Sequence, residues 1–278
     1  MIIDSFPFFN ETELCLIRLK YLYKAVDAFV ITESNLTWRC RPNPKKFDEV
    51  YKQLDQNIKD KIHYEYIEYP RDMINSEEHT NIKTTQNRSR DRLVEISKQI
   101  ANDETIFFYS DLDEIWDKNG LGLIKKLLRE GTDQIVCNMD MRIVYADWYT
   151  RQREWPGTRI TFLDNLQGET PLSTGKFKYS KSGAFRRHHA INNGWHFTYF
   201  GSKMQRLEKI QNIKNAIGWE EKVGKSYSQI AEHVNNLSEW NRVVRKKKIQ
   251  ARQLESLNLD PELEKYIEEY KLVSPAFK

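Results

Sequence analysis

The sequence is short of glycine, cysteine and long apolar runs, and each shortage excludes a class of protein. No glycine precedes Gly120, so the N-terminal part lacks both a dinucleotide-binding fingerprint and a phosphate-binding loop. The 3 cysteines are far apart and form neither a disulfide framework nor a zinc-binding spacing. No uncharged apolar stretch approaches the roughly 18 residues of a membrane-spanning helix, and the first residues lack a secretory signal pattern. We therefore expect a cytoplasmic location.

The composition is that of a globular protein, with 39% hydrophobic and 30% charged residues. The net charge is only +4, but residues 203–252 contain 12 basic and 5 acidic residues. Because the basic character is regional, a general role in binding nucleic acid is not expected. The composition predicts a domain at 1–202 and a charged, helical C-terminal extension at 203–278 that packs on it. Within that extension, the basic segment Arg242–Arg252 has two interpretations. It binds the surface of an anionic membrane, or it is a solvated helix whose positive charge is balanced by the acidic segment Glu262–Glu269.

Hydrophobic patterns predict alternating strands and helices, which favour an α/β fold with a doubly wound, mostly parallel sheet flanked by helices. Strands are expected at 2–9, 28–31, 63–69, 105–109 and 134–139, and helices near 10–21, 47–54, 81–100 and 121–128. Asn10 and Glu13 have the spacing of a capping box at the start of the first helix. Residues 141–200 appear irregular and rich in aromatic residues. A glycine-containing stretch at 218–226 has the wrong spacing for a phosphate loop and is interpreted as a helix end and turn.

The most informative motif is Asp111-Leu-Asp113-Glu114, which directly follows the apolar strand Thr105–Tyr109. Residues two apart on an extended segment point to the same side, so Asp111 and Asp113 should converge. This point lies at the carboxyl end of a central strand, where open α/β sheets bind ligands. Two convergent carboxylates without a basic residue in the motif are typical of a Mg²⁺ or Mn²⁺ site for a diphosphate.

Other interpretations of this motif remain open. Acidic residues also end strands as turn formers or helix caps. Haloacid-dehalogenase-type phosphatases place Asp-x-Asp after an apolar strand too, but near the start of the chain, whereas Asp111 lies far from it. Two other functions therefore stand as alternatives: a metal-dependent phosphatase or nucleotidyltransferase using the same carboxylates, and a non-catalytic glycan-binding protein.

Four segments together resemble glycosyltransferase family 17. They are Asp4–Glu11 with the following Leu14–Leu19, Val26–Asn35, Tyr109–Ile115 and Gly194–Phe197, in the family's order. The resemblance implies a GT-A fold, a nucleotide-sugar donor, a divalent metal and an inverting transfer of a sugar, GlcNAc from UDP-GlcNAc in the type that it resembles. A glycan or lipid-linked glycan is the implied acceptor.

The resemblance also implies roles for individual residues. The metal ligands would be Asp111, Asp113 and His196. The donor would be bound by Phe6, Glu33, Asn35, Asn87, Arg88, Arg92, Asp111 and Trp195. A solvated helix face is the other interpretation of Asn87, Arg88 and Arg92, and a packed core histidine is the other interpretation of His196. The family's Ser-Phe-x-His-x-Glu stretch has no counterpart at Asn212–Ile217, which puts the acceptor in doubt.

A transferase also needs a base for the acceptor hydroxyl and a surface for sugars. Asp140 and Asp147, near the fifth strand, are the candidate bases, with a turn or solvated loop as the other interpretation. Trp148, Tyr149 and Trp155 are candidates for stacking on sugar rings, or else belong to the core. His188 and His189 match no motif and are expected in a loop or on the surface.

Overall fold

The computed structural model describes residues 1–76, 79–150, 155–166, 187–212, 237, 251–275 and 277. The stretch 218–226 and most of the basic segment 242–252 lie outside these ranges. Within them, no helix has the length and apolar character needed to cross a membrane.

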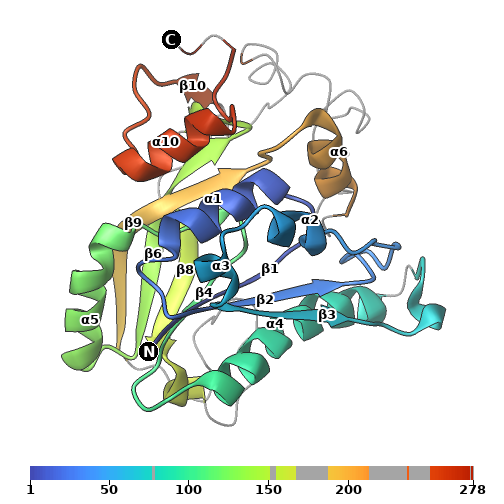
Figure 1. Cartoon of the computed structure of the whole chain (residues 1–278), viewed down its shortest axis with the longest axis horizontal. Coiled ribbons are helices and arrows are strands. Elements are labelled where there is room, and N and C mark those ends of the chain that lie inside the picture. The colour runs from blue at the N-terminus through green and yellow to red at the C-terminus, as the bar shows by residue number, and fades with distance from the viewer. Residues whose placement is uncertain are drawn as a thin grey trace.

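Strands and helices alternate along the first half of the chain, and four further strands follow (Figure 1). The strands are β1 (Ile2–Pro7), β2 (Ala28–Ser34), β3 (Ile62–Ile67), β4 (Ile106–Tyr109), β5 (Glu114–Ile115), β6 (Gln134–Ile143), β7 (Tyr145–Thr150), β8 (Trp155–Phe162), β9 (His188–Thr198) and β10 (Ala251–Gln253). The α-helices are α1 (Thr12–Leu22), α2 (Phe47–Lys52), α3 (Gln56–Lys59), α4 (His79–Ile100), α5 (Leu121–Arg129), α6 (Lys203–Asn212) and α10 (Pro261–Glu269), with 3-10 turns at Arg71–Met73, Lys118–Gly120 and Leu163–Leu166.

The sheet has the order β10-β7-β6-β8-β4-β1-β2-β3. Strands β4, β1, β2 and β3 are parallel to one another, whereas β8 joins β4 in the antiparallel sense. Beyond it, β6 pairs antiparallel with β8 and β7, and parallel with β9, which in turn pairs with the short β5. The predicted α/β sheet flanked by helices is confirmed, but the sheet is mixed rather than mostly parallel, because only β4, β1, β2 and β3 form a parallel half.

The parallel strands β1, β2 and β4 are buried on both faces because their side chains alternate between two apolar cores. Phe29, Ile31 and Phe108 belong to the core on the side of α1, and Val30 and Phe107 to the core under α4. In Figure 1, α1, α2 and α3 lie on one side of these strands and α4 on the other. Coverage of both faces explains why these strands read as continuous apolar runs.

Several local predictions were wrong. Asn10 does not cap α1; Glu11 occupies the cap position without a side-chain hydrogen bond, and the Asn10 amide donates to Glu208 of α6 instead. The region 141–200, expected to be irregular, contains all of β7, β8 and β9 and the end of β6. His188 and His189 begin β9 rather than lie in a loop, but the exposed His189 agrees with the expected surface position.

The described part of residues 203–278 contains a strand as well as helices. β10 pairs with β7 at the edge of the sheet. In α10, Tyr266 and the nearby Tyr270 lie against Lys20 of α1, whose ammonium donates to the Tyr270 hydroxyl at 2.9 Å. This part of the extension therefore packs against the first 202 residues.

Candidate active site

A cavity of about 330 Å³ opens where β1, β2 and β4 end. Its wall is formed by residues from both halves of the sheet and from helices on both sides. They are Pro7, Phe8, Phe9, Glu11, Thr32, Glu33, Ser34, Leu36, Thr37, Trp38, Asn43, Ser89, Arg90, Asp111, Leu112, Asp113, Trp155, His196, Thr198, Lys209 and Asn212. Carboxyl ends of neighbouring parallel strands meet at one edge of a sheet, which is where α/β proteins bind ligands.

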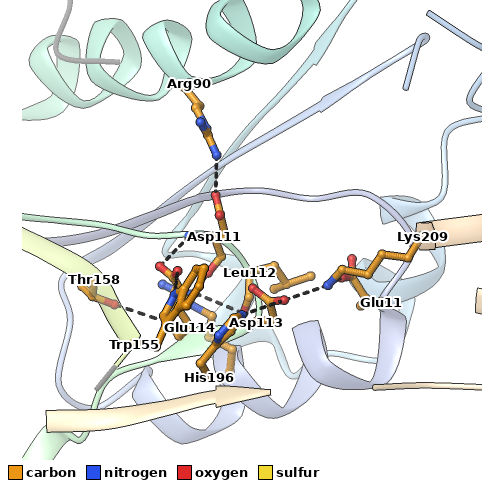
Figure 2. Close-up of polar contacts among 11 residues, drawn as sticks. Glu11, Arg90, Asp111, Leu112, Asp113, Glu114, Trp155, Thr158, His196 and Lys209 are labelled. Atoms are coloured by element: carbon orange, nitrogen blue, oxygen red, sulfur yellow. Dashed lines mark hydrogen bonds and ion pairs between the residues drawn. The ribbon is translucent and has the colours of Figure 1, made fainter. Parts of the chain in front are cut away.

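Asp111 and Asp113 both line the cavity, as the sequence predicts, but each is paired with a basic residue from a distant segment. The Arg90 guanidinium of α4 donates to Asp111 Oδ1 at 3.0 Å. The Lys209 ammonium of α6 donates to Asp113 Oδ2 at 2.7 Å (Figure 2). Repulsion between the two carboxylates is therefore offset within the protein itself.

Asp113 lies in the more strongly charged part of the site. Its Oδ2 atom is 3.3 Å from His196 Nε2, and Lys209 also contacts Glu11 Oε1 at 2.6 Å. Burial by itself raises the pKa of Asp113, but the Lys209 ammonium and the contact with the His196 imidazole outweigh burial and hold this pKa well below its ordinary value. Burial likewise acts to lower the pKa of Lys209, and the two carboxylates raise it instead. Both residues are therefore charged at neutral pH.

Arg18 of α1 holds the loop that contains both aspartates in place. Its guanidinium forms a two-bond pair with Asp4 of β1 and donates to the backbone carbonyls of Asp111, Leu112 and Glu114. Arg18 and Asp4 are both fully buried. A charge in the core is stable only when paired and hydrogen-bonded, and Arg18 meets that condition while fixing the path of the loop.

Trp155 and His196 form one wall of the cavity. Their rings are stacked with centroids 4.6 Å apart, and the Trp155 indole donates to Glu114 Oε1 at 2.7 Å. Of the three aromatic residues predicted to stack on sugars, only Trp155 lines the cavity. Trp148 is buried against Tyr145, and Tyr149 lies between Arg142 and Arg252.

The segment after β2 forms the far end of the cavity. Glu33 is buried there and accepts hydrogen bonds from the backbone amides of Lys46 and Phe47 and from the Tyr64 hydroxyl. Burial raises the pKa of Glu33, and these hydrogen bonds partly counteract it. Nearby, Arg90 lies over the Trp38 ring at 5.1 Å and connects this end with Asp111.

Several residues predicted to bind the donor lie away from the cavity wall. Phe6 is fully buried beneath the Arg18 guanidinium, and Trp195 packs edge-on against Tyr21. The Asn35 amide clamps the backbone of Tyr69, donating to its carbonyl and accepting from its amide.

The three residues of α4 that were predicted to bind the donor are not on the cavity wall either. Arg88 pairs with Glu95 on the exposed face of the helix, and Arg92 pairs with Glu65. Asn87 is not part of the cavity wall, whereas Ser89 and Arg90 are. The helix therefore does reach the site, but through residues other than the predicted ones.

Neither predicted base is on the cavity wall. Asp140 is exposed, 3.8 Å from Arg142. Asp147 is fully buried and accepts two hydrogen bonds from Ser274, one from the backbone amide at 2.7 Å and one from the hydroxyl at 2.6 Å. Neither carboxylate is placed to take a proton from a hydroxyl inside the cavity.

The donor atoms around Asp113 suit a cation that arrives with its own oxygen ligands. No three His, Cys, Asp or Glu side chains gather closely enough to hold a metal ion alone, within the part of the chain that the structure describes. However, Mg²⁺ is usually held by one or two carboxylates together with substrate phosphates. Asp113, next to His196, already has a cation beside it in the form of the Lys209 ammonium. The residues present thus fit a divalent metal that is shared with a diphosphate.

Sequence reasoning missed three charged residues of the cavity wall: Glu11, Arg90 and Lys209. Glu11 stood within a segment of family resemblance, and Arg90 lay in the arginine-rich stretch of α4. Lys209 had no such signal, since it belongs to a charged helix 96 residues from its partner Asp113.

The family model for glycosyltransferase family 17 matches residues 1–207, which include the whole cavity wall except Lys209 and Asn212. The chain belongs to glycosyltransferase family 17. Its reaction class is therefore glycosyl transfer, rather than phosphate-ester hydrolysis, nucleotidyl transfer or glycan binding without catalysis. No protein of curated function matches the sequence of this glycosyltransferase.

Some solved structures are similar to this family 17 chain at low identity. One is the galactosyltransferase LgtC in complex with donor and acceptor sugar analogs, at 14% identity over 69% of this chain and 73% of that chain, with a TM-score of 0.36. Another is 4-diphosphocytidyl-2C-methyl-D-erythritol synthase from Anaerococcus prevotii, at 9% identity over 69% of this chain and 87% of that chain, with a TM-score of 0.37. A third is mouse xyloside xylosyltransferase 1, at 12% identity over 67% of this chain and 77% of that chain, with a TM-score of 0.30. At these TM-scores the likenesses do not bear on function.

Proposed function

We propose that this glycosyltransferase is a metal-dependent inverting enzyme that transfers GlcNAc from UDP-GlcNAc to a hydroxyl of a glycan or lipid-linked glycan. The observation that carries the proposal is the continuity of one cavity from the segment after β2 to the acidic loop after β4. A nucleotide sugar is long and has an aromatic base, a charged diphosphate and a polar sugar, and the cavity wall offers groups suited to each.

The base end of the donor is assigned to the segment after β2. Leu36, Thr37 and Trp38 line the cavity there, and an indole ring is a suitable surface for stacking a base. Glu33 accepts hydrogen bonds from the backbone amides of Lys46 and Phe47 at the start of α2. Its role is therefore to hold this part of the cavity wall in place.

The diphosphate is assigned to the acidic loop. A divalent cation would be held there by Asp113 and His196 together with the phosphates, with Asp111 beside it, and when bound it would offset the charge that develops on the departing nucleoside diphosphate. Arg90 keeps the Asp111 carboxylate in a single orientation. The Arg18 contacts keep the backbone of the loop fixed during turnover.

The sugar and the acceptor are assigned to the wall formed by Trp155, His196 and Thr198. In a direct displacement the acceptor oxygen attacks the anomeric carbon, the bond from that carbon to the phosphate oxygen breaks, and the acceptor proton passes to a base. The flat face of Trp155 is suited to packing against a sugar ring. Its hydrogen bond to Glu114 fixes the ring orientation.

A thermal-shift panel tests this assignment. UDP, UDP-GlcNAc, other nucleotide sugars and free nucleotides are each added with Mn²⁺, with Mg²⁺ or with a chelator. We expect UDP and UDP-GlcNAc to raise the unfolding temperature only with a divalent metal, since a bound ligand stabilises according to its concentration over its dissociation constant. No stabilisation by any nucleotide sugar, or release of phosphate or pyrophosphate instead of UDP during turnover, would contradict the proposal.

A further inference from the structure

The Lys209 ammonium lies between two nearly buried carboxylates. It is 2.6 Å from Glu11 Oε1 and 2.7 Å from Asp113 Oδ2, and the side chains of these two acids are only 7% and 9% exposed. Figure 2 shows the three side chains converging from the start of α1, from the acidic loop and from α6. Lys209 therefore already occupies a place where the protein holds a cation.

This arrangement answers an electrostatic need. Two carboxylates that share a buried site cannot both stay ionised without a nearby positive charge. With all three groups charged, one negative charge is left over beside Asp113. A divalent ion in place of the ammonium would compensate both carboxylates more completely than a lysine does.

His196 lies beside the same carboxylate oxygen as Lys209. Its side chain is 8% exposed, its Nε2 atom is 3.3 Å from the Asp113 oxygen that Lys209 contacts, and its Nδ1 atom has no hydrogen-bond partner. A buried imidazole nitrogen without a partner carries a cost that a ligand or a rearrangement removes. The imidazole thus lies beside the ammonium with unused bonding capacity.

The helix that carries Lys209 contacts the N-terminal segment through polar groups. Gln205 donates to the Asn10 carbonyl and to Glu13, and Glu208 accepts from Asn10 and Lys46. Such contacts exchange for water at low cost compared with apolar packing. Among the side chains of α6 that the structure describes, movement of Lys209 away from Asp113 therefore breaks polar contacts only.

We propose that Lys209 is an internal cation that competes with the divalent metal for Asp113. This inference rests on the proposed function, because it concerns how that metal reaches its site. Without nucleotide, the metal has to displace the Lys209 ammonium from the carboxylates of Glu11 and Asp113. When UDP binds together with the metal, its diphosphate gives the displaced ammonium a new anionic partner. Metal binding should consequently be weak without nucleotide and strong with it.

The test measures Mn²⁺ affinity without nucleotide, by calorimetry, in the wild type and in Lys209→Met. Removing the competing charge should tighten Mn²⁺ binding about tenfold, within the range usual for coupled binding sites. Lys209→Arg keeps a positive charge and should leave the affinity near the wild-type value. Lys46→Met is the matched control, since Lys46 also contacts α6, through Glu208, but not Asp113.

A thermal readout accompanies the binding measurement. Without metal, Lys209→Met should unfold at a lower temperature than the wild type, and Mn²⁺ should recover the difference. If Lys209→Met does not fold, the double variant Glu11→Gln/Lys209→Met removes one of the two uncompensated carboxylates and should still bind Mn²⁺ more tightly than the single variant Glu11→Gln.

Equal Mn²⁺ affinity in the wild type and in a folded variant without Lys209 would overturn the inference, even if UDP and metal bind together as the proposed function requires. Failure of UDP to bind under any condition would instead contradict the proposed function. The two failures are therefore distinguishable, because the Mn²⁺ titration contains no nucleotide.

Discussion

Arg18 binds Asp4 through two hydrogen bonds, from Nε to Oδ2 at 2.8 Å and from Nη2 to Oδ1 at 2.7 Å, in a part of the core where both side chains are fully buried. The same guanidinium donates to three carbonyls of the acidic loop. One ion pair thus connects the first strand and the first helix with the residues that define the site.

Replacing Arg18 by Met should destabilise the protein by about 3–5 kcal/mol, because Asp4 is left as an uncompensated buried charge. Urea unfolding measures the change. Arg88→Met is the control, since Arg88 forms an exposed ion pair with Glu95 and should change the free energy of unfolding by less than about 1 kcal/mol. Equal effects of the two substitutions would contradict the structural role of Arg18.

Asp113→Asn should lower kcat/KM for sugar transfer by at least about 100-fold, since the cation it helps to hold is worth several kcal/mol in the transition state. Initial rates of UDP release measure the loss. Asp140→Asn is the matched control, because Asp140 is exposed and away from the cavity, and it should retain wild-type rates. Wild-type activity of Asp113→Asn would remove this residue from the site.

Arg90→Met should weaken UDP binding about tenfold in the presence of Mn²⁺. A hydrogen bond to a charged group is worth about 1.5–3 kcal/mol, and the substitution removes the guanidinium charge beside Asp111 and the diphosphate. Calorimetry gives the dissociation constants. Arg92→Met, two residues along the same helix and paired with Glu65, should bind UDP as the wild type does. The reverse order of effects would restore Arg92 as the donor-binding residue.

Asp147→Asn should reduce stability by about 1–3 kcal/mol while leaving kcat unchanged, because Asp147 accepts two buried hydrogen bonds from Ser274 and does not reach the cavity. Unfolding and steady-state rates are measured on the same preparation, at a temperature where the variant is folded. A large loss of kcat in a folded variant would return Asp147 to the role of base.

Glu33 should make the protein less stable as the pH rises. Burial raises its folded pKa above the ordinary value of about 4.3, so its contribution is fully present below that value and is lost as the pH rises through the folded pKa. The difference in unfolding free energy between the wild type and Glu33→Gln should therefore shift against the wild type as the pH rises from about 4 through the folded pKa of Glu33. Urea titrations across this range test the sign, and a difference that does not vary with pH would contradict it.

The sequence by itself determined the architecture of the first half of the chain and the position of the acidic motif. Side-chain alternation in an extended segment and apolar runs in buried strands are local properties, and they placed Asp111 and Asp113 at the end of β4. His196 followed from resemblance to the family.

Only the tertiary structure decided which charges meet these carboxylates. In α4, residues 88, 90 and 92 look equivalent as a sequence pattern, and the packing of the helix on the sheet selects Arg90 for the site. Lys209 contacts Asp113, which is 96 residues away in the sequence. Asp147, predicted as a candidate base, instead accepts a hydrogen bond from Ser274, which is 127 residues away. The physical reason is that a charged side chain looks the same in sequence whether it is solvated or paired, because its partner is set by long-range packing.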